Sequence, residues 1–100
     1  MLNINKQVNG TTLTMALAGR LDTTSAPQLE SELGGAVEGI KELIFDLKEL
    51  EYVSSAGLRV LLSAQKIMNK QGSMKITGAN EDIMEIFEVT GFVDILNIES

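Results

Sequence analysis

The sequence predicts an α/β fold, with a mixed β-sheet of four to five strands, an N-terminal hairpin and three or more α-helices. Two observations support this prediction. Asn9-Gly10 separates two runs of alternating apolar residues, and from residue 25 onward helical patterns alternate with short apolar runs. Strands separated by helices pair in parallel, so the antiparallel hairpin makes the sheet mixed. The 100 residues, 44% of them hydrophobic, suit a single domain over residues 1–100.

The predicted hairpin joins residues 2–8 to residues 11–18. Apolar residues alternate with polar ones in both runs, which is typical of strands with one buried face. Asn-Gly between two such runs is a strong signal for a type I′ turn, because both residues accept positive φ. We therefore expect the first two strands to be antiparallel neighbours.

The middle of the chain predicts a helix, a strand and a second helix. Ser25 and Gln28 have the spacing of a capping box, so the first helix should begin at this point. Leu43–Leu47 is apolar almost throughout, which is typical of a strand covered on both faces, and a short polar turn should follow it. Ser54 or Ser55 then occupies the N-cap position of the second helix.

The second helix should have two different faces. Its expected buried stripe consists of Gly57, Val60, Leu61, Ala64, Ile67 and Met68. At about 100° per residue, Arg59, Lys66 and Lys70 project on roughly the same side as Ser55. A polar and partly basic face should therefore extend along the helix from Ser55.

The last quarter of the chain predicts one short strand and one helix. Met74 and Ile76 mark the strand. Asn80 is followed by two acids, which is a clear helix start because acids are stabilised near the positive end of the helix dipole. Gly91 should end this helix. Residues 92–98 are either a last strand or an irregular tail docked on the core.

Composition excludes several kinds of site. The chain has no cysteine and no histidine, which excludes disulfides, thiolate and histidine catalysis, and metal sites built from those residues. A net charge of −6 disfavours binding to nucleic acid or to anionic membranes. No run approaches the ~20 apolar residues of a membrane span, and the N-terminus lacks the layout of a signal peptide. We expect a soluble, cytoplasmic protein without metal or cofactor.

Four segments resemble a known family. They are Gly19–Asp22 after the second predicted strand, Asp46-Leu47, Tyr52–Leu58 at the start of the second helix, and Ile86–Phe92 near the C-terminus. At this joint spacing they resemble the STAS domain, and more narrowly the bacterial anti-sigma factor antagonists, along essentially the whole chain. The resemblance implies a STAS-like fold and a protein that catalyses nothing itself but regulates transcription through protein–protein contacts.

In that family, a serine at this turn is phosphorylated by a partner that is both serine kinase and anti-sigma factor. The resemblance implies that the unphosphorylated chain binds this partner and frees the sigma factor. Phosphorylation of Ser55 would release the chain, and a serine phosphatase would reset it. Ser54 stands where the family has aspartate, so it is a second candidate acceptor. The implied partner-binding residues are Asp22, Thr23, Ser54, Gly57, Leu58 and Arg59.

Other interpretations of the same residues stay open. The two serines can be helix caps and nothing more, and Leu58 can be a core-edge residue or an exposed anchor. A STAS module can also act as a constitutive binding domain in a lipid-transport complex or a signalling scaffold. An enzyme would have to use Asp22, Asp46 and the two serines, among which no general base of suitable pKa stands out. The helix N-terminus could also hold a nucleotide phosphate, because its free N–H groups bind anions.

Overall fold

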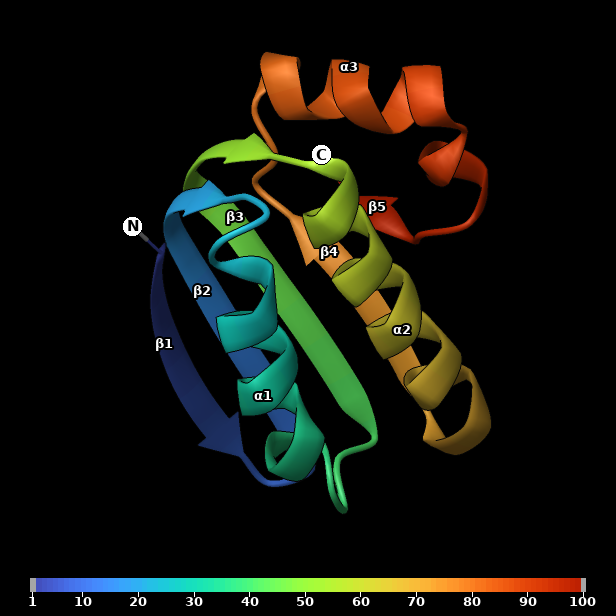
Figure 1. Cartoon of the computed structure of the whole chain (residues 1–100). Helices are drawn as coiled ribbons and strands as arrows, with labels where there is room; N and C mark the ends of the chain where they lie inside the picture. Colours follow the sequence, from blue (N-terminus) through green and yellow to red (C-terminus); the bar gives the residue numbers. More distant parts are fainter. Residues whose placement is uncertain (1, 100) are drawn as a thin grey trace.

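The computed structural model describes residues 2–99, and its elements follow the predicted order (Figure 1). The strands are β1 (Leu2–Asn9), β2 (Thr12–Leu21), β3 (Glu42–Val53), β4 (Ser73–Thr77) and β5 (Ile98–Glu99). The helices are α1 (Ala26–Ala36), α2 (Ser55–Gln71) and α3 (Glu81–Thr90), and a 3₁₀ turn covers Phe92–Asp94. The predicted α/β fold is confirmed.

The strands form one mixed sheet in the order β1-β2-β3-β4-β5. β1 and β2 are antiparallel, and the other neighbouring pairs are parallel, so the hairpin is confirmed. Its turn type was predicted wrongly. Asn9 pairs with Thr12, which leaves Gly10 and Thr11 as the central residues, and of these only Gly10 has a positive φ, 64°. A type I′ turn needs positive φ at both central positions.

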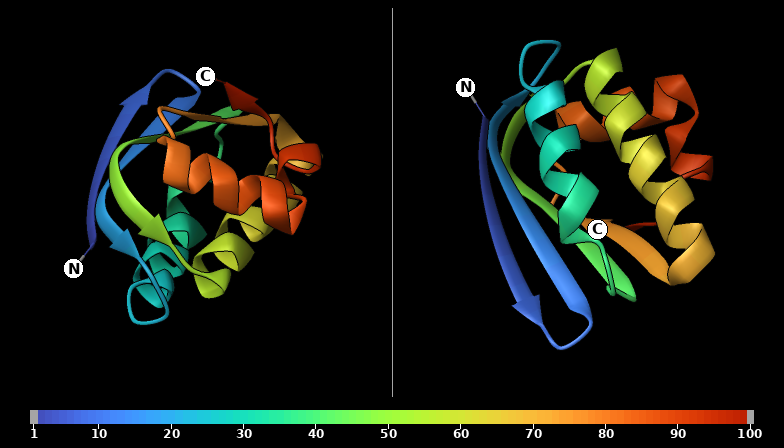
Figure 2. Two further views of the ribbon diagram at one scale, coloured as in Figure 1. Left: turned by 90° about the horizontal axis from the view of Figure 1, so that it is seen from above. Right: turned by 60° about the horizontal axis from the view of Figure 1, so that its bottom comes forward.

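Helices α1 and α2 lie side by side on one face of the sheet (Figures 1 and 2). The core fills the space between this face and the helices, with Met15, Leu29, Phe45 and Leu61 each 0% exposed. Helix α3 lies across the end of the sheet at which β3 leads into α2 (Figure 1). Phe87 of α3 is also 0% exposed, so this helix closes the core at that end.

Strand β3 is longer than predicted and has only one fully buried face. It continues through the expected polar turn to Val53, because β2 runs beside it as far as Leu21. In its first half, buried residues alternate with partly exposed ones, as Phe45 does with Ile44. Since α1 and α2 cover the same face, the expectation of a strand buried on both faces is wrong.

The helix ends follow the sequence signals in part. Asn80 Oδ1 accepts a hydrogen bond from Ile83 N at 2.9 Å, and Gly91 ends α3 with a φ of 80°, both as expected. Ser25 makes no side-chain cap bond, so the predicted capping box does not form. In α2, Ile67 is 38% exposed, which removes it from the predicted buried stripe.

Candidate functional site

The two serines that follow β3 have different roles. Ser54 is extended, with φ −96° and ψ 175°, and its Oγ accepts a hydrogen bond from Gly57 N at 3.2 Å. Its carbonyl accepts from Leu58 N at 2.9 Å, so Ser54 is the N-cap of α2. Ser55 is the first helical residue and is exposed, and its hydroxyl makes no hydrogen bond within residues 2–99. One hydroxyl is therefore engaged in the fold and the other is free.

Asp22 organises the loop between β2 and α1. Its Oδ1 accepts hydrogen bonds from Thr24 Oγ1 at 2.7 Å, Thr24 N at 3.0 Å and Ser25 N at 3.1 Å. The Thr24 hydroxyl is the largest cause that lowers the pKa of Asp22 to about 2, and the other hydrogen bonds add to it. Asp22 is therefore a fixed, half-buried negative charge at neutral pH.

The rest of this loop is held by Ser25 and Arg20. Ser25 Oγ donates to the Arg20 carbonyl at 2.8 Å and accepts from Asp22 N at 2.9 Å, which explains why it does not cap α1. The Arg20 side chain lies with its Nε 3.8 Å from Asp22 Oδ2 and its guanidinium 4.5 Å from the centre of the Tyr52 ring. These contacts give the loop a defined shape before any partner arrives.

Gly57 brings the Asp22 loop and the two serines together. A Cβ at position 57 would lie 2.7 Å from Leu21 Cγ and 2.9 Å from Val53 Cγ2, so only glycine lets α2 begin this close to the ends of β2 and β3. Leu21 pairs with Val53 in the sheet, and Ser54 N donates to the Leu21 carbonyl at 2.8 Å. The structure therefore places Asp22 beside the turn that carries Ser55.

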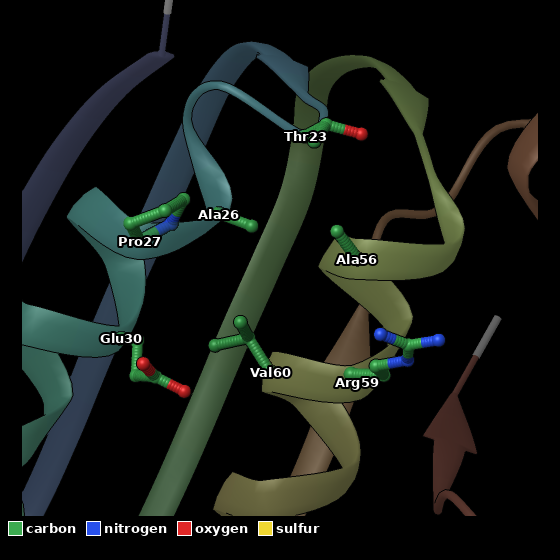
Figure 3. Close-up of a pocket in the computed structure, with 7 residues that line it drawn as sticks. All are labelled: Thr23, Ala26, Pro27, Glu30, Ala56, Arg59 and Val60. Atoms are coloured by element: carbon green, nitrogen blue, oxygen red, sulfur yellow. The ribbon is translucent and has the colours of Figure 1, made fainter.

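A hollow of about 190 Å³ opens between the first turns of α1 and α2 (Figure 3). Glu30 borders it on α1 and Arg59 on α2, and Thr23 lies at its upper end. The lining residues are Thr23, Ala26, Pro27, Glu30, Ala56, Arg59 and Val60. Ala26, Pro27, Glu30 and Ala56 were not among the site residues predicted from the sequence. One signal for this hollow was available in the sequence. Both helices begin at the same edge of the sheet, and both have small residues in their first turns.

The predicted site residues divide by exposure. Thr23, Ser55 and Arg59 are exposed, and Asp22 and Ser54 are partly exposed. Leu58 is 4% exposed, so its prediction as a partner-binding residue is corrected: its side chain belongs to the core. Gly57 is also buried, and its lack of a side chain allows α2 to begin close to Leu21 and Val53.

Two further features concern cofactors and membranes. Within residues 2–99, acidic side chains do not gather in a group of three or more that could hold a metal ion. Across the same residues, no helix combines the length and the apolar character needed to cross a membrane.

Known proteins resemble this chain in sequence and in structure. The STAS domain family profile matches residues 3–100. The anti-sigma-B factor antagonist of Bacillus subtilis is 32% identical over 100 residues, which cover 99% of this chain and 92% of that protein. An anti-sigma factor antagonist from Mycobacterium paratuberculosis has the same fold, with a TM-score of 0.89 and 19% identity over 98% of this chain and 85% of that one.

A second solved structure is SpoIIAA, described as a Bacillus cell fate determinant in its phosphorylated form. It aligns with a TM-score of 0.74 and 16% identity, over 100% of this chain and 92% of that chain. The fold described above is thus shared with these two solved structures. On the match over residues 3–100, this chain belongs to the STAS domain family.

Proposed function

We propose that this chain is an anti-sigma factor antagonist whose binding is switched by phosphorylation of Ser55. In this proposal the unphosphorylated chain binds an anti-sigma factor with serine kinase activity in the bacterial cytoplasm. Phosphorylation releases the chain, and a serine phosphatase resets it. The observation that carries the proposal is the free, exposed hydroxyl of Ser55 beside the ordered Asp22 loop. The names of the relatives, and the phosphorylated form of SpoIIAA, support it.

A phosphate at Ser55 is compatible with the fold. It would lie at the N-terminus of α2, where free N–H groups and the helix dipole favour negative charge. Arg59, one turn further along, is exposed and can pair with it. The fold should therefore persist, and phosphorylation should act on the surface that a partner meets.

The same phosphate would be unfavourable in a contact. It adds a charge of about −1.5 to −2 beside Asp22, whose low pKa keeps its own charge in place. In a partner contact that buries the phosphate away from Arg59, the unpaired charge costs about 3–5 kcal/mol. Since every ~1.4 kcal/mol is tenfold in affinity, binding should weaken roughly 10²- to 10³-fold or more.

Ser55 is the better acceptor of the two serines. The Ser54 oxygen already accepts the Gly57 N–H, and a kinase would have to break this cap before it could use that hydroxyl. Loss of such a cap costs about 1 kcal/mol. We therefore assign the phosphate to Ser55, and the contact surface around it to Asp22, Thr23, Ser54 and Arg59, with Gly57 and Leu58 as its support.

The test combines phosphorylation with binding. The wild-type chain, Ser55→Ala, Ser55→Asp and Ser54→Ala should be incubated with an anti-sigma factor kinase and ATP, and their intact masses measured. Wild type and Ser54→Ala should gain one phosphate and Ser55→Ala none. In calorimetric titrations, Ser55→Ala should bind the kinase as wild type does, and Ser55→Asp at least 100-fold more weakly.

Ser63 offers a matched control, because it is another exposed serine of α2. Ser63→Asp should keep wild-type affinity. A phosphate mapped elsewhere than Ser55, or equal binding by the Ala and Asp variants at position 55, would contradict the proposal. Equal binding would favour a STAS module that acts as a constitutive binding domain in another assembly.

A further inference from the structure

Charge is unevenly distributed along the chain. Residues 1–75 contain equal numbers of acidic and basic residues, whereas residues 76–100 contain acids and neither lysine nor arginine. The whole net charge of −6 therefore lies in the last quarter of the sequence. Most of these acids belong to α3, so this helix is the acidic pole of the molecule.

The outer face of α3 combines acids with an exposed apolar side chain. Glu81, Glu85 and Glu88 follow one another at helical spacing and are exposed. Val89 lies beside this stripe and is 77% exposed, more than any other large hydrophobic residue within residues 2–99. Together with Ala79 and Met84, these residues line an open hollow of about 590 Å³. We call Glu81, Glu85, Glu88 and Val89 the acidic face.

Helix α2 carries the same pattern with the opposite charge. Arg59, Lys66 and Lys70 form an exposed stripe, and Ile67 beside it is 38% exposed. We call these four residues the basic face. Ile67 directly follows Lys66, as Val89 directly follows Glu88. At about 100° per residue, both apolar side chains thus lie on the same flank of their charged stripes.

Neither face is neutralised within the molecule. The ion pairs within residues 2–99 are Lys6–Glu32, Arg20–Asp22 and Lys75–Glu99. None of them includes a residue of the acidic or the basic face. Like charges one turn apart destabilise a helix by about 0.2–0.5 kcal/mol per pair. Each face would therefore gain from an opposite charge supplied from outside.

We propose that the acidic face of one copy of this chain binds the basic face of a second copy. In an antiparallel pair of helices whose charged stripes face each other, the residues that directly follow the stripe residues in sequence lie on the same side of the contact. This arrangement places Ile67 against Val89 while Lys66 and Lys70 face the glutamates. Charge complementarity and the matching flanks thus point to the same partner.

The physical character of this contact follows from its parts. Exposed ion pairs are weak and are screened by salt, so the association is weak, reversible and strongest at low ionic strength. It joins two different surfaces, so it is a head-to-tail contact. It uses neither Ser55 nor Asp22, but its basic face includes Arg59, which also belongs to the proposed switch surface. The test therefore reverses Lys66 and Lys70 and leaves Arg59 unchanged.

Charge reversal gives a direct test by sedimentation velocity at about 1 mM protein, in about 10 mM salt, where the Debye length is ~30 Å. The wild-type chain should self-associate, and about 1 M salt should abolish this. Lys66→Glu/Lys70→Glu makes both faces acidic, and Glu81→Lys/Glu85→Lys makes both basic. Each variant alone should remain monomeric. An equimolar mixture of the two should associate again.

The control is Glu38→Lys/Glu51→Lys. It changes the net charge by the same amount as Glu81→Lys/Glu85→Lys, but at exposed positions outside α3. It should associate like wild type. Circular dichroism checks the fold, and Glu81→Gln/Glu85→Gln replaces the reversal if that variant unfolds. A monomeric wild type at low salt would overturn the proposal. Association that survives reversal of either face, a mixture that stays monomeric, or equal loss in the control would also overturn it.

Discussion

Gly57→Ala tests the central structural claim about the site, namely that α2 begins in direct contact with the ends of β2 and β3. The new methyl group would lie 2.7 Å from Leu21 Cγ, 2.9 Å from Val53 Cγ2 and 3.0 Å from the Leu21 carbonyl oxygen. Leu21 is 0% exposed and Val53 2%, so neither side chain has space to move aside. The carbonyl is held by its hydrogen bond from Ser54 N at 2.8 Å. The first turn of α2 would have to shift instead.

The expected magnitude is a balance of opposing effects. Alanine favours a helix over glycine by about 1 kcal/mol. Overpacking of this kind costs about 1–3 kcal/mol, and the shift would also weaken the Ser54 cap, which contributes about 1 kcal/mol. The free energy of unfolding should therefore fall by about 2 kcal/mol, with a Tm lower by about 10 °C.

The assay is urea unfolding followed by far-ultraviolet circular dichroism, with Gly34→Ala as control. Gly34 lies inside α1, is exposed, and has no atom within 4 Å of the added Cβ, so this variant should gain about 1 kcal/mol. A Gly57→Ala variant as stable as Gly34→Ala would refute the proposed close contact. In that case, glycine at 57 would have no steric role in positioning Ser55.

Four further predictions concern other residues of the fold. Ser54→Ala should lower the free energy of unfolding by about 1 kcal/mol in the same urea experiment, because Gly57 N loses its cap. Thr24→Val should raise the pKa of Asp22 from about 2 towards 3.8, as measured by NMR titration, because the Thr24 hydroxyl is the largest cause of the lowering. This pKa is depressed in the folded state, so the stability that Asp22 contributes is present above pH ~3.8 and is lost as the pH falls through ~2. Asp22→Asn should therefore abolish the loss of stability that occurs between these two pH values. Gly72→Ala should destabilise the fold by about 3 kcal/mol or more, because its Cβ would overlap the Lys41 carbonyl.

Local signals in the sequence predicted the elements well. The hairpin, the start of α3 at Asn80 and its end at Gly91 each depend on a few adjacent residues, and each is confirmed. The turn type failed because strand pairing moved the central positions from Asn9-Gly10 to Gly10-Thr11. Propensity describes a dipeptide, whereas the register is decided along the whole pair of strands.

The orientation of α2 could not be predicted from periodicity. A 3.6-residue pattern gives the relative positions of residues around a helix, while the buried arc depends on what the helix packs against. In the structure this arc is displaced towards Leu58 and Gln65, which are 4% and 8% exposed, and away from Ile67. Leu58 is therefore a core residue, and the surface around Ser55 is smaller and more polar than expected.

The distribution of charge changes what the net charge of −6 means. Taken as one number, it indicates a chain that repels acidic partners everywhere. In the fold, the excess of acidic over basic residues lies on and after α3. The exposed face of α2, by contrast, is basic from Arg59 to Lys70. A partner of Ser55 would meet a cationic helix next to the fixed carboxylate of Asp22. A phosphate at Ser55 adds negative charge to this locally balanced surface, where it has a larger relative effect than it would on a uniformly acidic one. The placement of the acids at the other helix thus keeps the surface around Ser55 sensitive to a single phosphate.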